Sequence, residues 1–305
     1  MTLGFGALKK EDLLTLISYI MEKNRMPKFG VARKYAKDLP NYIGILKQNN
    51  IDAYEIGFAY GVPSALSEEI VESSKRYNVS LSGHLPFWIN LGNDNEDKNI
   101  NYMVSGLNIA EQLDSVIVFH LGFYNKKKFN EFKENIIKSI QKALNLSKTK
   151  KGILGIETTG KQKAIGTVDE IIEIIKSINT KRVIPIIDWS HLYARSNGIY
   201  PYSYQDFKEI LEKIEREIGY KPSYFHGGGV EYKKGNEIKH ISAKTFEPPL
   251  PHLFAALKDL GYSDFIFIVE SPDSIEDVRW LKQVWNSPED YFKDVLNRKT
   301  KTLSD

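Results

Sequence analysis

The sequence has no cysteine among its 305 residues. This absence excludes disulfide bonds, thiolate metal sites and cysteine nucleophiles, and it leaves His, Asp and Glu as the strong metal ligands. The chain also lacks an apolar run of about 20 residues, the length that spans a bilayer, and its first residues lack the apolar segment of a secretory signal peptide. We therefore expect a cytoplasmic protein with no membrane contact.

No charge of one sign dominates the composition. The net charge is +3, and 42% of the residues are hydrophobic, which is enough for a substantial core. A mildly basic chain is compatible with an anionic partner but does not require one. We see no internal repeat or low-complexity block, and we expect a monomer.

Short apolar runs rich in β-branched residues recur along the chain and predict eight strands. The stretches between most of them have helical periodicity, as in 168–178, 204–218 and 275–285. Thr167 with Glu170 predicts a capping box before the first of these helices, and Asp273 with Glu276 resembles one before the last. The apolar runs begin at Leu3, Ile51, Val79, Ser115, Gly152, Val183, Pro222 and Phe265.

This alternation continues without a linker or a change in composition. It favours an α/β fold with a single (β/α)8 TIM barrel over residues 1–290, followed by a polar, frayed C-terminal tail over 291–305. A doubly wound open sheet is the alternative architecture. Pro185 falls inside a predicted central strand, where its missing N–H predicts a bulge.

Most of the apolar runs end in a residue that can bind a metal ion. In a parallel barrel the C-terminal strand ends converge on one rim, so these side chains are expected to meet. A lone histidine at a strand end is more often a hydrogen-bonded structural residue, but a carboxylate after four or more apolar residues is costly to bury unless it is paired or coordinated. The strand-end residues are His84, His120, Glu157, Asp188, His226 and Glu270.

Two further histidines belong to this pattern. His191 follows Asp188 by three residues, and His240 follows His226 in the glycine- and lysine-rich stretch 224–248. Such a set suits Zn²⁺, with Mn²⁺ or Fe²⁺ as competitors, and contains more ligands than one ion needs. We therefore expect a multi-metal centre, a type of site that suits phosphodiester hydrolysis.

The loops that follow these strand ends are basic. Lys126, Lys161, Arg195 and Lys233 could neutralise phosphates of a nucleic acid. The alternative interpretation is that they are ordinary exposed loop residues.

Several motifs together resemble the endonuclease IV family of abasic-site endonucleases. They are, in chain order, "GHLPFWINLGN", "FHLGF", "IETTGKQKAIGT", "IIDWSHLYA" and "IVES", and they span about Ser82 to Glu270. The first of these motifs separates this family from sugar isomerases and epimerases of related barrel fold. The resemblance implies a zinc-dependent enzyme that cleaves double-stranded DNA on the 5′ side of abasic sites and leaves a 3′-hydroxyl.

The resemblance also assigns roles to residues. It implies that His84 and His120 hold one zinc ion and that Glu157 bridges to a second, which Asp188, His226 and Glu270 complete. It places His191 and His240 at a third ion, and Glu157 and Glu270 as the catalytic carboxylates nearest the nucleophile. Phe87 falls where the family has an aromatic residue that enters the DNA at the lesion.

The departures from the family concentrate after His226. Three glycines follow it in place of Leu-Asn-Asp-Ser-Lys, and Ile238 occupies the aspartate position of the family's Asp-x-His motif. Isoleucine cannot bind zinc, so Glu237 would have to reach the ion, or the third site would be weak or absent. The basic stretch 23–40 is also longer than the family's first crossover, and is either a DNA-contacting insertion or a solvated connection.

Two other functions fit the same residues. A sugar isomerase or epimerase would use one divalent ion held by Glu157, Asp188, His226 and Glu270, with Glu157 and Glu270 as an acid-base pair. A non-catalytic relative would bind abasic DNA without cutting it. The number of metal ions per chain separates the enzymes, since one favours the isomerase and two or three favour the nuclease.

Overall fold

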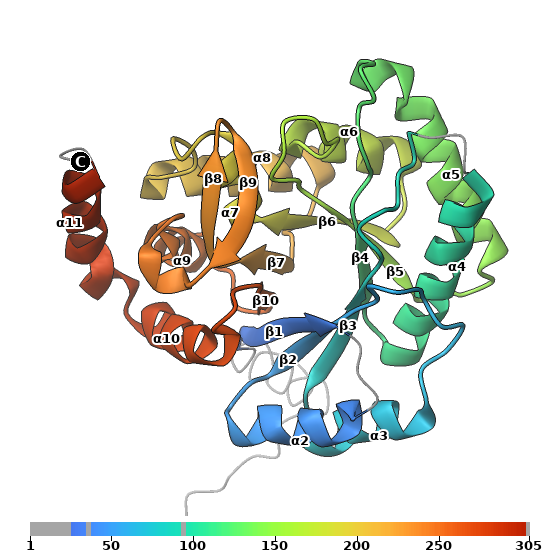
Figure 1. Cartoon of the computed structure of the whole chain (residues 1–305), viewed down its shortest axis with the longest axis horizontal. Coiled ribbons are helices and arrows are strands. Elements are labelled where there is room, and N and C mark those ends of the chain that lie inside the picture. Colours follow the sequence, from blue (N-terminus) through green and yellow to red (C-terminus); the bar gives the residue numbers. More distant parts are fainter. Residues whose placement is uncertain (1–25, 35–37, 93–95, 303–305) are drawn as a thin grey trace, which may run out of the picture.

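The computed structural model describes residues 26–34, 38–92 and 96–302. Eight parallel strands form a closed barrel in the order β1-β10-β7-β6-β5-β4-β3-β2 (Figure 1). This confirms the predicted (β/α)8 fold and excludes the open sheet. The strands are β1 (Lys28–Lys34), β2 (Ala53–Gly57), β3 (Ser80–His84), β4 (Val116–Phe119), β5 (Ile153–Glu157), β6 (Val183–Asp188), β7 (Tyr224–Gly227) and β10 (Ile266–Val269).

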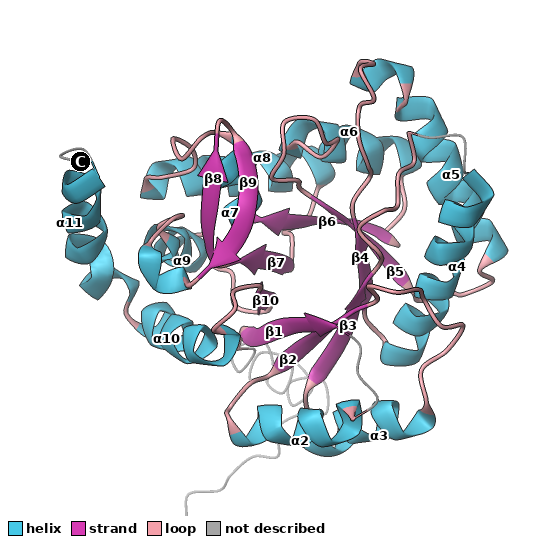
Figure 2. Ribbon diagram, viewed as in Figure 1, coloured by secondary structure: helices cyan, strands magenta, loops and turns pink. Residues whose placement is uncertain are grey.

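Helices surround the barrel, and Figure 2 shows them outside the ring of strands. The predicted capping box is present, since the Thr167 hydroxyl accepts from the Glu170 N–H at the start of α6. Asp273 precedes α10 but makes no side-chain cap hydrogen bond, so that predicted box is wrong. The helices are α2 (Leu39–Gln48), α3 (Glu68–Tyr77), α4 (Glu96–Leu113), α5 (Lys133–Leu146), α6 (Val168–Ile178), α7 (Trp189–Arg195), α8 (Tyr204–Ile218), α9 (Leu250–Asp259), α10 (Ser274–Asn286) and α11 (Phe292–Thr302).

The stretch after β7 forms an antiparallel hairpin of β8 (Gly229–Lys233) and β9 (Asn236–Ile241). Both hairpin strands contact α7, and Figure 1 shows the hairpin beside the C-terminal end of β7. The hairpin therefore lies on the rim where the predicted ligands end their strands.

Small and branched apolar side chains fill the inside of the barrel. Val116 and Val118 on β4, Ile186 on β6 and Ile268 on β10 belong to one buried cluster, which is distinct from the larger cluster between strands and helices. Successive residues of a strand point to opposite faces, so every second residue of these strands faces the interior. This alternation determines which residues reach the rim.

The N-terminal part of the barrel corrects the sequence analysis. The run at Leu3 lies outside the described residues, and the barrel closes without it because Lys28–Lys34 supplies the first strand. The stretch 23–40, interpreted as an insertion or connection, therefore contains β1. The strand has only four uncharged residues, from Phe29 to Ala32, with Lys28 before them and Arg33 and Lys34 after them, so no long apolar run marks it in the sequence.

The bulge predicted at Pro185 is also wrong. Pro185 pairs with Ile156 in an unshifted register between β5 and β6, and the register with β7 begins only at Ile187. The strand thus accommodates the missing N–H without an extra residue.

The predicted C-terminal tail contains the helix α11. No helix in the described part of the chain has the length and apolarity to cross a membrane.

Candidate metal centre

The strand alternation explains how the predicted ligands come together. Three of the predicted ligands each lie two positions after a residue of the barrel interior: His120 follows Val118, Asp188 follows Ile186 and Glu270 follows Ile268. They therefore point toward the barrel axis, one layer above the apolar filling. His84, Glu157 and His226 reach the same layer from β3, β5 and β7.

Glu157 is the centre of the cluster. Its side chain is 1% exposed, and its Oε2 lies 3.0 Å from His84 Nε2 and 2.5 Å from His120 Nε2. Its other oxygen, Oε1, lies 3.0 Å from His226 Nδ1. One carboxylate thus faces histidines on both sides, which is the arrangement of a carboxylate that bridges two cation positions.

A second group shares Glu157 and adds Asp188, His226 and Glu270. His226 Nδ1 lies 3.6 Å from Glu270 Oε1. Asp188 begins α7 as its N-cap, and its Oδ1 accepts from the His191 N–H at 2.9 Å. Its Oδ2 is buried without a hydrogen-bond partner. A buried carboxylate oxygen is costly in that state, so its environment favours a cation.

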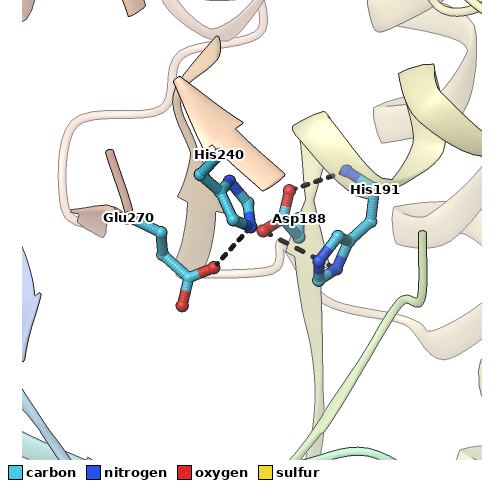
Figure 3. Close-up of side chains that lie close together, drawn as sticks. All are labelled: Asp188, His191, His240 and Glu270. Atoms are coloured by element: carbon cyan, nitrogen blue, oxygen red, sulfur yellow. Dashed lines mark hydrogen bonds and ion pairs between the residues drawn. The ribbon is translucent and has the colours of Figure 1, made fainter. Parts of the chain in front are cut away.

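The hairpin supplies the remaining contacts at the rim. His240 Nε2 lies 3.2 Å from Glu270 Oε2, and Figure 3 shows both side chains beside Asp188 and His191. Glu237 faces both histidines, with its Oε2 3.2 Å from His191 Nε2 and its Oε1 3.7 Å from His240 Nε2. The hairpin therefore adds one carboxylate and one imidazole to the cluster.

A β-bulge explains why Glu237 reaches the site although Ile238 occupies the expected ligand position. Glu231 pairs with Lys239, and Tyr232 pairs with Glu237, which leaves Ile238 without a partner in the register. A bulge residue shifts the alternation of faces by one position. Ile238 is consequently 53% exposed, whereas the Glu237 and His240 side chains are only 17% and 15% exposed.

The charges of the cluster set its protonation. Burial lowers the pKa of His84, but the hydrogen bond to Glu157 and the nearby carboxylate charges outweigh burial and raise the pKa to about 9. Burial raises the pKa of Glu157, but the charges of His120 and His226 hold it well below 4.5. Burial also raises the pKa of Glu270, and here the raised value persists. Glu270 therefore holds a proton more readily than Glu157 does.

The same balance holds at the hairpin. Burial raises the pKa of Glu237, but its hydrogen bond to His191 and the charge of that imidazole lower the pKa to about 2. Burial lowers the pKa of His191, but the charge of Asp188 and the hydrogen bond to Glu237 raise it well above 6.5. The histidines and carboxylates therefore form charged pairs that a metal ion would replace with metal–ligand bonds.

These side chains form three overlapping sets of possible metal ligands. Within each set the ligand atoms lie within 4.8 Å of one another. Nitrogen and carboxylate oxygen donors suit a divalent transition-metal ion, so the residues present fit the predicted metal centre. The sets are His84, His120 and Glu157; Glu157, Asp188, His226 and Glu270; and Asp188, His191, His240 and Glu270.

A pocket of about 310 Å³ opens onto the cluster from the rim. The predicted DNA-binding residues Phe87 and Lys161 line it, together with several of the ligands. Phe87 is 70% exposed and projects from the loop after β3. Lys126 and Lys233 are exposed but lie outside the lining of this pocket.

The Arg195 guanidinium makes hydrogen bonds within the protein. Its Nη1 donates to the carbonyl oxygens of Lys161 and Ala164, at 2.5 and 2.9 Å, and its Nη2 donates to the Tyr124 hydroxyl. The guanidinium therefore holds the loop after β5 against α7. These contacts are architectural, and the phosphate contact of Arg195 stays a prediction.

Glu55 is a site residue that the sequence analysis missed. It lies on β2, two positions after Ala53 of the barrel interior, and its Oε2 is 3.0 Å from His226 Nε2. The available signal was a charged residue inside the apolar run "IDAYEIG". It was overlooked because the other ligands were sought at the ends of the runs.

The family model described as "Xylose isomerase-like TIM barrel" matches residues 43–290. The uncharacterized protein MJ0133 of Methanocaldococcus jannaschii is 32% identical over 265 residues, which cover 82% of this chain and 93% of that protein. A protein of Mycoplasmopsis pulmonis named "Probable endonuclease 4" is 27% identical over 134 residues, 43% of this chain and 48% of that protein.

Solved structures of two kinds share the fold. Endonuclease IV from Thermus thermophilus has a TM-score of 0.63 at 21% identity and covers 87% of this chain and 99% of its own. A D-tagatose 3-epimerase-like protein has a TM-score of 0.63 at 20% identity, with 86% and 98% covered. At these identities the likeness establishes the barrel and leaves the reaction open.

Proposed function

This chain belongs to the family of xylose isomerase-like TIM barrels, and within that family we propose that it is a metal-dependent phosphodiesterase that incises duplex DNA on the 5′ side of abasic sites. The observation that carries the proposal is the His84, His120 and Glu157 group. A one-ion isomerase needs only the Glu157, Asp188, His226 and Glu270 group. The additional pair of histidines on the opposite side of Glu157 fits a second ion.

Zinc is the proposed metal, with two or three ions per chain, and Mn²⁺ or Fe²⁺ are the alternatives. The donor set consists of imidazole and carboxylate groups, which zinc accepts readily. Divalent ions in such a centre supply a nucleophile from water at neutral pH and stabilise the charge that develops on a phosphodiester. The Oδ2 of Asp188, which has no hydrogen-bond partner and lies 3.6 Å from His191 Nδ1, and the two-sided contacts of Glu157 support this assignment.

The third ion, in this proposal, is held by His191, His240 and Glu237. Ile238 stands where the resembling family has an aspartate ligand. Glu237 takes over this role because the bulge turns its side chain toward His191. Glu237 is ionised over the whole neutral range because its pKa is lowered to about 2. It therefore supplies the negative charge that an aspartate would supply.

Two carboxylates have proposed roles in the chemistry. Glu157 places a negative charge between the His84 and His120 pair on one side and His226 on the other, and its contacts orient these imidazole rings. Glu270 lines the pocket beside the other ligands, so it is suited to orient the attacking water.

The rim provides the proposed contacts to DNA. Phe87 offers an exposed apolar ring that can fill the gap left by an abasic nucleotide, where stacking and pairing are already lost. Lys161 lines the same pocket and can neutralise a phosphate beside the metal centre. Lys126 and Lys233 lie farther out, where they would contact the DNA backbone.

The proposal is tested with a 5′-labelled duplex that contains one tetrahydrofuran abasic analogue. We expect the zinc-loaded protein to incise it on the 5′ side and leave a 3′-hydroxyl that a DNA polymerase extends. An undamaged duplex, a chelator-treated sample and the folded Glu270→Gln variant are the controls, and all three are expected to give no product. Absence of incision by folded, zinc-loaded protein would refute the proposal.

A sugar isomerase or epimerase is the second candidate. The four-ligand group of Glu157, Asp188, His226 and Glu270 is sufficient for the single ion that such an enzyme uses. A panel of ketohexoses and ketopentoses, incubated with the metal-loaded protein and analysed for epimers by chromatography, tests it. Epimer formation without DNA incision would favour this candidate.

A further inference from the structure

Glu55 lies outside the three ligand sets, yet it is buried beside the metal centre. The residue is 1% exposed and projects from the middle of β2 into the barrel interior. A carboxylate in such a position destabilises the fold unless neighbouring groups compensate for the lost hydration. The groups that contact the Glu55 carboxylate, Tyr224 and His226, therefore indicate its role.

The hydrogen bonds of the Glu55 carboxylate are all made by one of its two oxygens, Oε2. Tyr224 donates its hydroxyl hydrogen to Glu55 Oε2 at 2.8 Å, and His226 Nε2 lies 3.0 Å from the same oxygen. Ser82 Oγ lies 2.5 Å from the Tyr224 oxygen, so the serine hydroxyl donates to the tyrosine, whose own hydrogen is directed to Glu55. This chain of bonds fixes the orientation of the carboxylate.

Both ring nitrogens of His226 face carboxylate oxygens, with Nε2 beside Glu55 and Nδ1 beside Glu157. An ionised carboxylate only accepts hydrogen bonds, so each of these nitrogens donates an N–H in the metal-free protein. Nδ1 faces Glu157 Oε1 at 3.0 Å and Glu270 Oε1 at 3.6 Å. A cation in the four-ligand group would take the place of the hydrogen on Nδ1, whereas Glu55 would retain the hydrogen on Nε2.

We propose that Glu55 is a positioning residue of the metal centre, which holds His226 with Nε2 protonated and Nδ1 directed at the ion. Carboxylates that receive the second N–H of a ligating histidine raise its basicity and fix its ring, and their loss typically weakens metal binding about 10–100-fold. This role rests on the metal centre and is independent of whether the substrate is DNA or a sugar.

The experiment measures zinc binding by the metal-free protein against a competing chelator, without an activity assay. Glu55→Ala is expected to bind zinc about 10–100-fold more weakly at the His226 position. Glu55→Gln keeps an oxygen that can accept from Nε2, so it is expected to fall between the wild type and Glu55→Ala. Tyr224→Phe retains the Glu55–His226 contact and is expected to change the affinity less than Glu55→Ala.

Glu111→Ala is the matched control for a lost structural carboxylate. Glu111 accepts from the backbone N–H groups of Lys150, Lys151 and Gly152, at the end of the barrel opposite the ligands. This variant is expected to melt at a lower temperature and to bind zinc with wild-type affinity. It separates general destabilisation from an effect on the metal centre.

A ¹⁵N spectrum of the histidine rings in the zinc-loaded protein provides the independent readout. The wild type is expected to show His226, identified by its loss in His226→Gln, with the hydrogen on Nε2, and Glu55→Gln is expected to keep this state. Wild-type zinc affinity and an unchanged His226 signal in Glu55→Ala would overturn the proposal. If Glu55→Ala does not fold, wild-type zinc affinity in Glu55→Gln would overturn it instead.

Discussion

Glu237 lies 3.2 Å from His191 across the barrel rim, from Oε2 to Nε2, although the two residues belong to a hairpin strand and to the helix after β6. The contact depends on the bulge at Ile238, which turns Glu237 to the same face as His240. Glu237 therefore supplies a carboxylate at this place, although the sequence motif has Ile238 where the family has an aspartate.

Glu237→Ala is expected to bind one metal ion fewer per chain than the wild type. The variant removes the carboxylate that faces both His191 and His240. The carboxylates that remain beside these histidines, Asp188 and Glu270, also belong to the neighbouring four-ligand set, so they are expected to hold a third ion only weakly. Metal analysis after gel filtration measures the difference. Glu231→Ala on the same hairpin is the control, because Glu231 pairs with the exposed Lys239 and faces away from the ligands. Equal metal content in both variants would contradict the assignment.

His120→Ala separates the two candidate enzymes. His120 contacts Glu157 and belongs to the set with His84, but it is outside the four-ligand set that an isomerase needs. For the nuclease we expect loss of one ion and a fall in incision of about 100-fold or more, because both ions take part in the chemistry. Incision rates with single-turnover kinetics measure this. Incision at the wild-type rate would show that the His84 and His120 group is not part of the catalytic centre.

Zinc affinity is expected to rise as the pH increases from 6.5 to 9. The pKa of His84 is raised to about 9, so at neutral pH the ring carries a proton that must leave before its nitrogen binds the ion. The same shift stabilises the metal-free fold below pH 6.5, and this contribution is lost as the pH rises through about 9. Chelator competition across this range measures the affinity. A flat profile would contradict the raised pKa.

Phe87→Ala is expected to weaken binding to abasic duplex and to leave binding to undamaged duplex unchanged. The ring is 70% exposed, so its removal should not affect folding, while stacking of an aromatic ring on a base contributes about 1–3 kcal/mol. Fluorescence anisotropy in calcium or without metal measures binding without cleavage. Tyr60→Ala, at a residue that is 89% exposed, is the control. An equal loss on both duplexes would indicate that Phe87 contributes to general binding and does not recognise the lesion.

The ligands at strand ends could be predicted from sequence because two local rules apply to them. Apolar runs mark the strands, and the closed parallel barrel brings their C-terminal ends to one rim. His84, Glu157 and Asp188 follow these rules directly. The family resemblance then grouped them, and the structure places them in the same sets.

The remaining residues depend on information that is not local. Glu55 lies inside a strand, and only the alternation of the assembled barrel directs it to His226. Glu237 depends on how two hairpin strands pair, because the bulge is a property of the register between them. The strand at Lys28–Lys34 is charged at both ends, and its pairing with β2 and β10 on either side overrides that composition.

The number of metal ions per folded chain distinguishes a multi-metal centre from a one-ion site. Native mass spectrometry of protein purified without chelators, together with elemental analysis, counts the ions and identifies the metal. We expect two or three ions, predominantly zinc, with one ion lost in Glu237→Ala if three are present. A single ion per chain, bound by a protein that retains its fold, would contradict the multi-metal centre and favour the one-ion isomerase.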